Sequence, residues 1–196
     1  MSLFLVEKGN VKVKPYLTLD EQRAGDVGLS GAKGELLGAE GGALPVIEEV
    51  VDFATALICA EAVGAMKFAC DTTLEYLKTR KQFGVPIGTF QALQHRMVDM
   101  VVSHEQAKSM ACLACSKVDA SADAAADARD RARCVSAAKI KIADSCRQIS
   151  QEAIQLHGGI GMSEELKVSH TFRRLTMIAQ QFGDAEHHLA RFAGLG

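Results

Sequence analysis

Apolar residues after position 45 recur at steps of three and four, the spacing of one face of an α-helix. This pattern predicts long helices over about 46–81, 89–115, 124–156 and 164–181, and a short last helix over 184–192. The first helix is expected to face the core through Ile47, Val50, Ala54, Leu57, Gly64 and Phe68. The second is expected to use Leu93, Met97, Met100, Val101 and His104, and the third Val135, Ala138, Ile142, Cys146, Ile149 and Ala153. Four long helices with short connections predict a mostly α protein, an up-and-down four-helix bundle.

The first 42 residues have a different pattern. Residues 3–6 and 11–14 are strand-like on either side of a Gly9-Asn10 turn signal, and residues 26–29 favour a further short strand before a glycine-rich linker. Two or three strands are rarely stable without a face to pack on, so we expect poor order here. The chain is therefore expected to divide into a short β remnant over 1–42 and a helical domain over 43–196.

Composition narrows the class of protein. The chain has 48% hydrophobic and 23% charged residues and a net charge of −2, which is ordinary for a globular protein. We find no basic stripe with interleaved aromatic residues and no apolar run near the roughly 20 residues of a membrane span. These features argue against nucleic-acid and membrane partners and favour a cytoplasmic location.

The cysteines and histidines do not predict a metal site. All six cysteines lie in helix-patterned, alanine-rich stretches, which favours reduced thiols over a disulfide framework. Cys112-x-x-Cys115 is read as a pair of buried core thiols, because no second ligand pair accompanies it. Adjacent His187 and His188 would point in different directions on a helix, so we expect surface or subunit-contact side chains.

The corner between the first two helices carries the most specific signal. Residues 80–95 read R-K-Q-F-G-V-P-I-G-T-F-Q-A-L-Q-H, and residues 155–162 read Q-L-H-G-G-I-G-M. Taken alone, Arg80 and Lys81 could simply complement the negative end of a helix dipole. Together, the two stretches resemble the signatures of the FAD-dependent acyl-CoA dehydrogenase family. The resemblance covers nearly the whole chain and corresponds to the family's C-terminal helical domain and the end of its middle β-domain.

The resemblance implies a function and a set of sites. Family members desaturate acyl-CoA thioesters: a carboxylate takes the α-proton while hydride leaves the β-carbon for the flavin. FAD-binding positions carried over to this chain are Arg80, Phe83, Gln91, Gln155, Gly158, Gly159 and Asp184. Substrate-binding positions are Ala54, Thr55 and Gly183. The pyrophosphate end of the cofactor is completed across a subunit boundary, which implies a dimer or a dimer of dimers in fatty acid metabolism.

The catalytic base departs from the family pattern. The usual glutamate lies in a Tyr-Glu-Gly-Thr stretch that matches Gln181 to Asp184, so its position is taken by Phe182. A minority position in the first helix matches Ala54. Glu61, seven residues further along the expected apolar stripe, is a candidate for a relocated base, and the alternative is a structural or pocket-lining glutamate.

Two function classes stay open. The chain is either part of an active acyl-CoA dehydrogenase or a non-catalytic partner subunit, or oligomerisation domain, of a heteromeric one.

Overall fold

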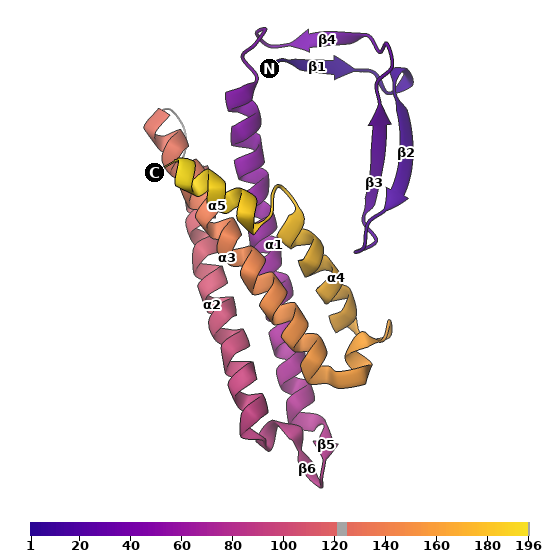
Figure 1. Ribbon diagram of the computed structural model, residues 1–196, viewed down its shortest axis with the longest axis vertical. Helices are drawn as coiled ribbons and strands as arrows, with labels where there is room; N and C mark the ends of the chain where they lie inside the picture. Colours follow the sequence, from indigo (N-terminus) through magenta and orange to yellow (C-terminus); the bar gives the residue numbers. More distant parts are fainter. Residues whose placement is uncertain (121–124, 196) are drawn as a thin grey trace. The chain divides into compact units, whose positions relative to one another are not determined.

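The computed structural model describes residues 1–120 and 125–195, which divide into two compact units, residues 1–51 and 52–196 (Figure 1). The first unit holds four strands: β1 (Leu3–Val6), β2 (Lys12–Leu17), β3 (Arg23–Gly28) and β4 (Gly34–Leu37). β1 pairs antiparallel with β4, Leu3 opposite Leu37, and β2 pairs antiparallel with β3, Lys12 opposite Gly28.

The strand assignments are confirmed only in part. β1, β2 and β3 lie where strands were predicted, but a 3₁₀ turn over Lys8–Asn10 separates β1 from β2, and these two strands do not pair with each other. β4 was not predicted; it lies just before the predicted glycine-rich linker over residues 38–45. Most side chains of the four strands are exposed, as expected for strands without a covering face. The expected poor order and the division after residue 42 stay predictions.

The helices follow the predicted order closely. They are α1 (Leu44–Thr79), α2 (Gln91–Ala120), α3 (Ala125–His157), α4 (Lys167–Gln180) and α5 (Ala185–Gly194), and successive long helices reverse direction (Figure 1). The two-residue strands β5 (Lys81–Gln82) and β6 (Val85–Pro86) and a 3₁₀ turn (Ile87–Thr89) join α1 to α2. A second 3₁₀ turn (Gly158–Met162) follows α3. The predicted four-helix bundle is confirmed.

The core confirms one predicted stripe and corrects another. All six predicted residues of α3 are buried, including Ile142 and Ile149 at 0% exposed. In α1 the predicted stripe is wrong, because Leu57 is 55% and Phe68 40% exposed, whereas Ile58 and Met66 lie in the core. Apolar residues occur on more than one side of α1, so steps of three and four fit two different faces.

Two smaller expectations, about the cysteines and the histidines, are corrected by the structure. All six cysteines are free, but Cys112 is exposed, so the Cys112-x-x-Cys115 pair is not a pair of buried thiols. His188 is only 1% exposed, so its assignment to the surface is wrong. Within residues 1–120 and 125–195, no cluster of three or more His, Cys, Asp or Glu side chains could hold a metal. No helix in the same ranges is long and apolar enough to span a bilayer.

Candidate functional site

A cleft of about 640 Å³ lies where the end of α1, the β5–β6 corner, the start of α2 and the end of α3 meet. Its walls are formed by Tyr76, Arg80, Gln82, Ile87, Leu93, Arg96, Gln155, Leu156, His157, Gly158, Gly159 and Ile160. The volume falls within the range of about 300–1,000 Å³ that small-molecule sites occupy. Four of the predicted cofactor residues, Arg80, Gln155, Gly158 and Gly159, therefore share one cleft.

Local backbone geometry brings the two signature stretches to this place. The last turn of α1 closes as the Arg80 amide donates to the Tyr76 carbonyl at 2.8 Å. The Ile87 amide donates to the Arg80 carbonyl at 2.8 Å, which fixes the hairpin of β5 and β6 against the helix end. On the opposite wall, Gly158 has φ +64°, a left-handed conformation that glycine adopts without a Cβ penalty and that ends α3.

Among the described residues that line the cleft, one cation, Arg80, is available for an anion. Arg96 is already paired, with its Nε 2.6 Å from Oε2 of Glu152. Arg80 is exposed, and no carboxylate in the described parts of the chain pairs with it. A guanidinium binds phosphate oxygens in a planar, bidentate geometry, so Arg80 suits a phosphate or pyrophosphate.

His157 stiffens the wall of the cleft. Its Nδ1–H donates to the Ala153 carbonyl at 2.8 Å, and its ring centroid lies 4.5 Å from that of Tyr76. Burial lowers the pKa of His157, so the ring is neutral at physiological pH. Nε2 is buried and has no hydrogen-bond partner among the described residues, so solvent and ligands do not reach it.

Two predicted cofactor residues at the same corner do not line the cleft. Phe83 is at the tip of the β5–β6 hairpin with φ +54° and is 91% exposed, with its ring edge-on to Phe90. Gln91, at the start of α2, is exposed and is not among the lining residues. Sequence reasoning, in turn, missed Tyr76 and Arg96, whose positions depend on packing between helices.

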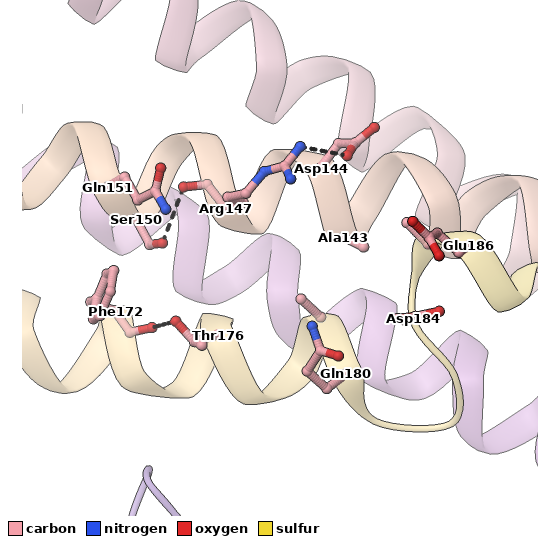
Figure 2. Close-up of a pocket in the computed structure, with 12 residues that line it drawn as sticks. Ala143, Asp144, Arg147, Ser150, Gln151, Phe172, Thr176, Gln180, Asp184 and Glu186 are labelled. Carbon is pink, nitrogen blue, oxygen red and sulfur yellow. Dashed lines mark hydrogen bonds and ion pairs between the residues drawn. The ribbon is translucent and has the colours of Figure 1, made fainter.

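Asp184 lies in a second, smaller cleft of about 360 Å³, between α3, α4 and the start of α5 (Figure 2). Its carboxylate accepts a hydrogen bond from the His187 amide at 2.8 Å and so caps α5. Glu186 lies beside it, and the Arg147 guanidinium is paired with Asp144 at 3.2 Å (Figure 2). The acidic side chains and the capped helix end make this cleft a poor site for a phosphate, and Asp184 does not join Arg80.

The comparison with known proteins now gives the family. Residues 42–193 match the family model described as "Acyl-CoA dehydrogenase, C-terminal domain". The chain belongs to the acyl-CoA dehydrogenase family. This confirms the resemblance drawn from the two signature stretches.

Individual relatives agree with this membership. The chain is 36% identical over 142 residues to the acyl-CoA dehydrogenase IpdE2 of Mycolicibacterium smegmatis, an alignment that covers 72% of this chain and 42% of that protein. A variant of the Tcur3481-Tcur3483 steroid ACAD matches with TM-score 0.84 and 27% identity, covering 99% of this chain and 51% of that one. PigA with FAD and proline matches with TM-score 0.87 and 26% identity, over 98% and 51%. The chain thus spans about half the length of these relatives.

The two positions that the sequence resemblance predicts for the family's base carry no carboxylate. Phe182 lies in the turn between α4 and α5 and is 47% exposed, and Ala54 is half-buried beside Thr55, which is fully buried. Glu61 does not point into the core as expected. Its side chain is 48% exposed and forms a bidentate pair with Arg174, whose Nε and Nη2 donate to it at 2.5 and 2.8 Å. The phase error in the α1 stripe explains the wrong orientation.

Proposed function

We propose that this chain is part of a FAD-dependent acyl-CoA dehydrogenase, to which it contributes a cofactor-binding cleft but not the catalytic base. The observation that carries the proposal is the convergence of Arg80 and the Gln155 to Gly159 stretch on one cleft. The family resemblance would place the base at residue 182, which is a phenylalanine in this chain. When bound, FAD would supply the hydride acceptor for α,β-desaturation of an acyl-CoA thioester.

The residues of the cleft fit the adenine and pyrophosphate end of FAD. The Arg80 guanidinium would bind phosphate oxygens, and Gly158 and Gly159 would let main-chain amides approach them, because nothing lies within 4 Å of the place that a Cβ would take. The mixed apolar and polar wall suits a heterocycle next to a charged group. By the family pattern, this end would belong to a cofactor shared with another subunit.

A missing base favours a heteromer in which another subunit supplies the carboxylate. One relative is named as a two-component steroid ACAD, which makes a bulky acyl-CoA substrate and a homologous partner reasonable for this chain. Exposed apolar side chains on α1 and α2, such as Leu57 at 55% and Val98 at 58%, support packing against a further subunit or domain. A homodimer or homotetramer is the alternative assembly.

The second candidate function is an active acyl-CoA dehydrogenase in which Glu61 is a relocated base. The bidentate pair with Arg174 argues against it, because both carboxylate oxygens of Glu61 are already engaged by guanidinium donors rather than directed at a substrate. A base near the thioester also needs a pKa tuned toward the working pH.

The test measures FAD affinity in the purified native assembly by flavin fluorescence. Arg80→Ala should weaken FAD binding by about 10- to 150-fold, the range for losing one charge-assisted contact. Lys81→Ala is the matched control, since it removes the same charge from the next residue, which does not line the cleft.

Equal FAD affinity in the Arg80→Ala and Lys81→Ala variants would show that the cleft does not hold the cofactor. An assembly that contains no FAD under any condition would overturn the proposal altogether.

A further inference from the structure

The turn between α4 and α5 has a backbone that needs an explanation. Phe182 has φ +58° and Gly183 φ +103°, both in the left-handed region. For a residue with a side chain this conformation costs about 1–2 kcal/mol. The Phe182 ring is 47% exposed, so its burial does not offset the whole cost. Contacts to the main chain of the turn must hold it.

Lys139 on α3 provides the first of these contacts. Its side chain is 0% exposed, and Nζ donates to the carbonyls of Ala179 at 3.0 Å and Gly183 at 2.8 Å. Ala179 belongs to the last turn of α4, whose carbonyls carry the negative end of the helix dipole. One buried cation thus ties the end of α4 to the turn that follows it.

His188 on α5 provides the second contact. Its Nε2 lies 3.0 Å from the Phe182 carbonyl, which can only accept, so Nε2 carries the proton. Nδ1 is then an acceptor and lies 3.4 Å from the hydroxyl of Ser136, which donates to it. The ring is 1% exposed, so it is shielded from competing water.

From Ser136, the hydrogen-bond network continues to Arg191 and Asp52. Arg191 is a donor only, and its Nη1 lies 3.2 Å from the Ser136 oxygen and 2.7 Å from Oδ1 of Asp52. Asp52 is 0% exposed, and its Oδ2 accepts from Nε of Arg131 at 3.2 Å. A buried carboxylate on α1 therefore fixes Arg191, which fixes Ser136, the tautomer of His188 and finally the Phe182 carbonyl.

We propose that Lys139 and the Asp52–Arg191–Ser136–His188 chain are positioning residues for the α4–α5 turn, which hold the backbone at 182 and 183 whichever side chain residue 182 carries. The significance of the turn rests on the proposed function, because this is where acyl-CoA dehydrogenases place the base.

The experiment uses nuclear magnetic resonance on the 196-residue chain at pH 7.5 and needs neither FAD nor a partner. The ring-nitrogen shifts of His188 report its tautomer. Hydrogen exchange of the Gln181 and His187 amides, which donate to the Met177 carbonyl and to Asp184, reports the local stability of the turn. Exchange rates are corrected for global stability from denaturant unfolding.

Three substitutions have distinct expected outcomes. Ser136→Ala should shift His188 from the Nε2–H tautomer and speed exchange at the turn by about 2- to 10-fold. Lys139→Met should speed hydrogen exchange at the turn by about 10- to 100-fold, because two charge-assisted hydrogen bonds are lost. This effect should persist when the global stability of the variant is unchanged. Phe182→Glu should leave the tautomer unchanged and exchange within about twofold of the original chain. Ser150→Ala is the control for Ser136→Ala, because Ser150 is buried on the same helix and its hydroxyl donates only to the Arg147 carbonyl of that helix, at 3.3 Å, away from the turn.

The proposal is overturned if Ser136→Ala and Ser150→Ala behave alike, or if Phe182→Glu disturbs the turn as strongly as Ser136→Ala. If Lys139→Met does not fold, the Ser136→Ala and Phe182→Glu results still decide. Because no cofactor takes part, a failure here is separate from a failure of FAD binding.

Discussion

The buried imidazole of His188 should make the stability of the bundle fall when the pH drops from 7.5 to 5. Burial, aided by the nearby cations Lys139 and Arg191, lowers the pKa of His188 to about 4, despite the bond to the Phe182 carbonyl. An unfolded chain has an ordinary histidine pKa of about 6.5. Between these two values the unfolded chain binds the proton and the folded chain does not, so acid favours unfolding.

The size of the effect follows from the two pKa values. At pH 7.5 neither state binds much proton at this site. At pH 5 the unfolded histidine is almost fully protonated and the folded one is about one-tenth protonated, which amounts to about 2 kcal/mol of lost stability. Full protonation of both states, below pH 4, would bring the loss to about 3 kcal/mol. Burial also lowers the pKa of His157, which adds a contribution in the same direction.

The assay is urea unfolding followed by helical circular dichroism at several pH values between 7.5 and 5. Between pH 7.5 and 5, the His188→Gln variant should lose about 2 kcal/mol less unfolding free energy than the original chain. The contribution of His157 should remain in both. His187→Gln is the control, because His187 is adjacent but exposed. Parallel curves for the original chain and His188→Gln would refute the reasoning.

Two further predictions concern other buried groups. Asp52→Asn should destabilise the bundle by about 3–5 kcal/mol in urea unfolding, because Arg131 and Arg191 lose a buried counter-charge. Asp71→Asn, which breaks only an exposed pair with Lys67, should stay within about 0.5 kcal/mol, and equal effects would contradict the account. Native iodoacetamide labelling should reach exposed Cys112 but not Cys146, since burial raises the pKa of the latter thiol to about 12; peptide mass spectrometry showing equal rates would contradict this.

The third helix was predictable because its sequence offers one apolar face. Val135, Ile142 and Ile149 follow one another at seven-residue steps with mostly polar or small residues between them, so one helical phase fits best. In α1 apolar residues such as Leu57 and Ile58 lie next to each other, and the phase depends on the neighbouring helices. Which of these residues faces the core depends on packing against the neighbouring helices, and the periodicity of one helix cannot predict it.

The strand pairing had the same difficulty in a different form. A Gly9-Asn10 signal is local, whereas β1 pairs with β4 at residues 34–37 through a long loop closure. Turn residues predict where the chain bends, but they do not predict which distant strand pairs with a given strand.

Only part of the candidate site could be predicted from the sequence. The signature stretches supplied Arg80 and the glycines of the cleft, but not the positioning residues of the α4–α5 turn. One signal was available: Lys139 lies in register with Val135, Ile142 and Cys146, so a charge occurs on the core stripe of α3. A lysine at such a position needs buried acceptors, and here they are the carbonyls of Ala179 and Gly183.

The central claim is that the chain contacts the flavin cofactor without supplying the base. The direct measurement is anaerobic single-turnover bleaching of FAD by a panel of acyl-CoA thioesters in the native assembly carrying Glu61→Gln, with Glu75→Gln as an exposed control on the same helix. We expect bleaching rates within about twofold of the original assembly for both variants, because the proposed base lies in another subunit. A loss of about 100-fold or more in Glu61→Gln alone, the scale of removing a general base, would contradict the account and make this chain its own catalyst.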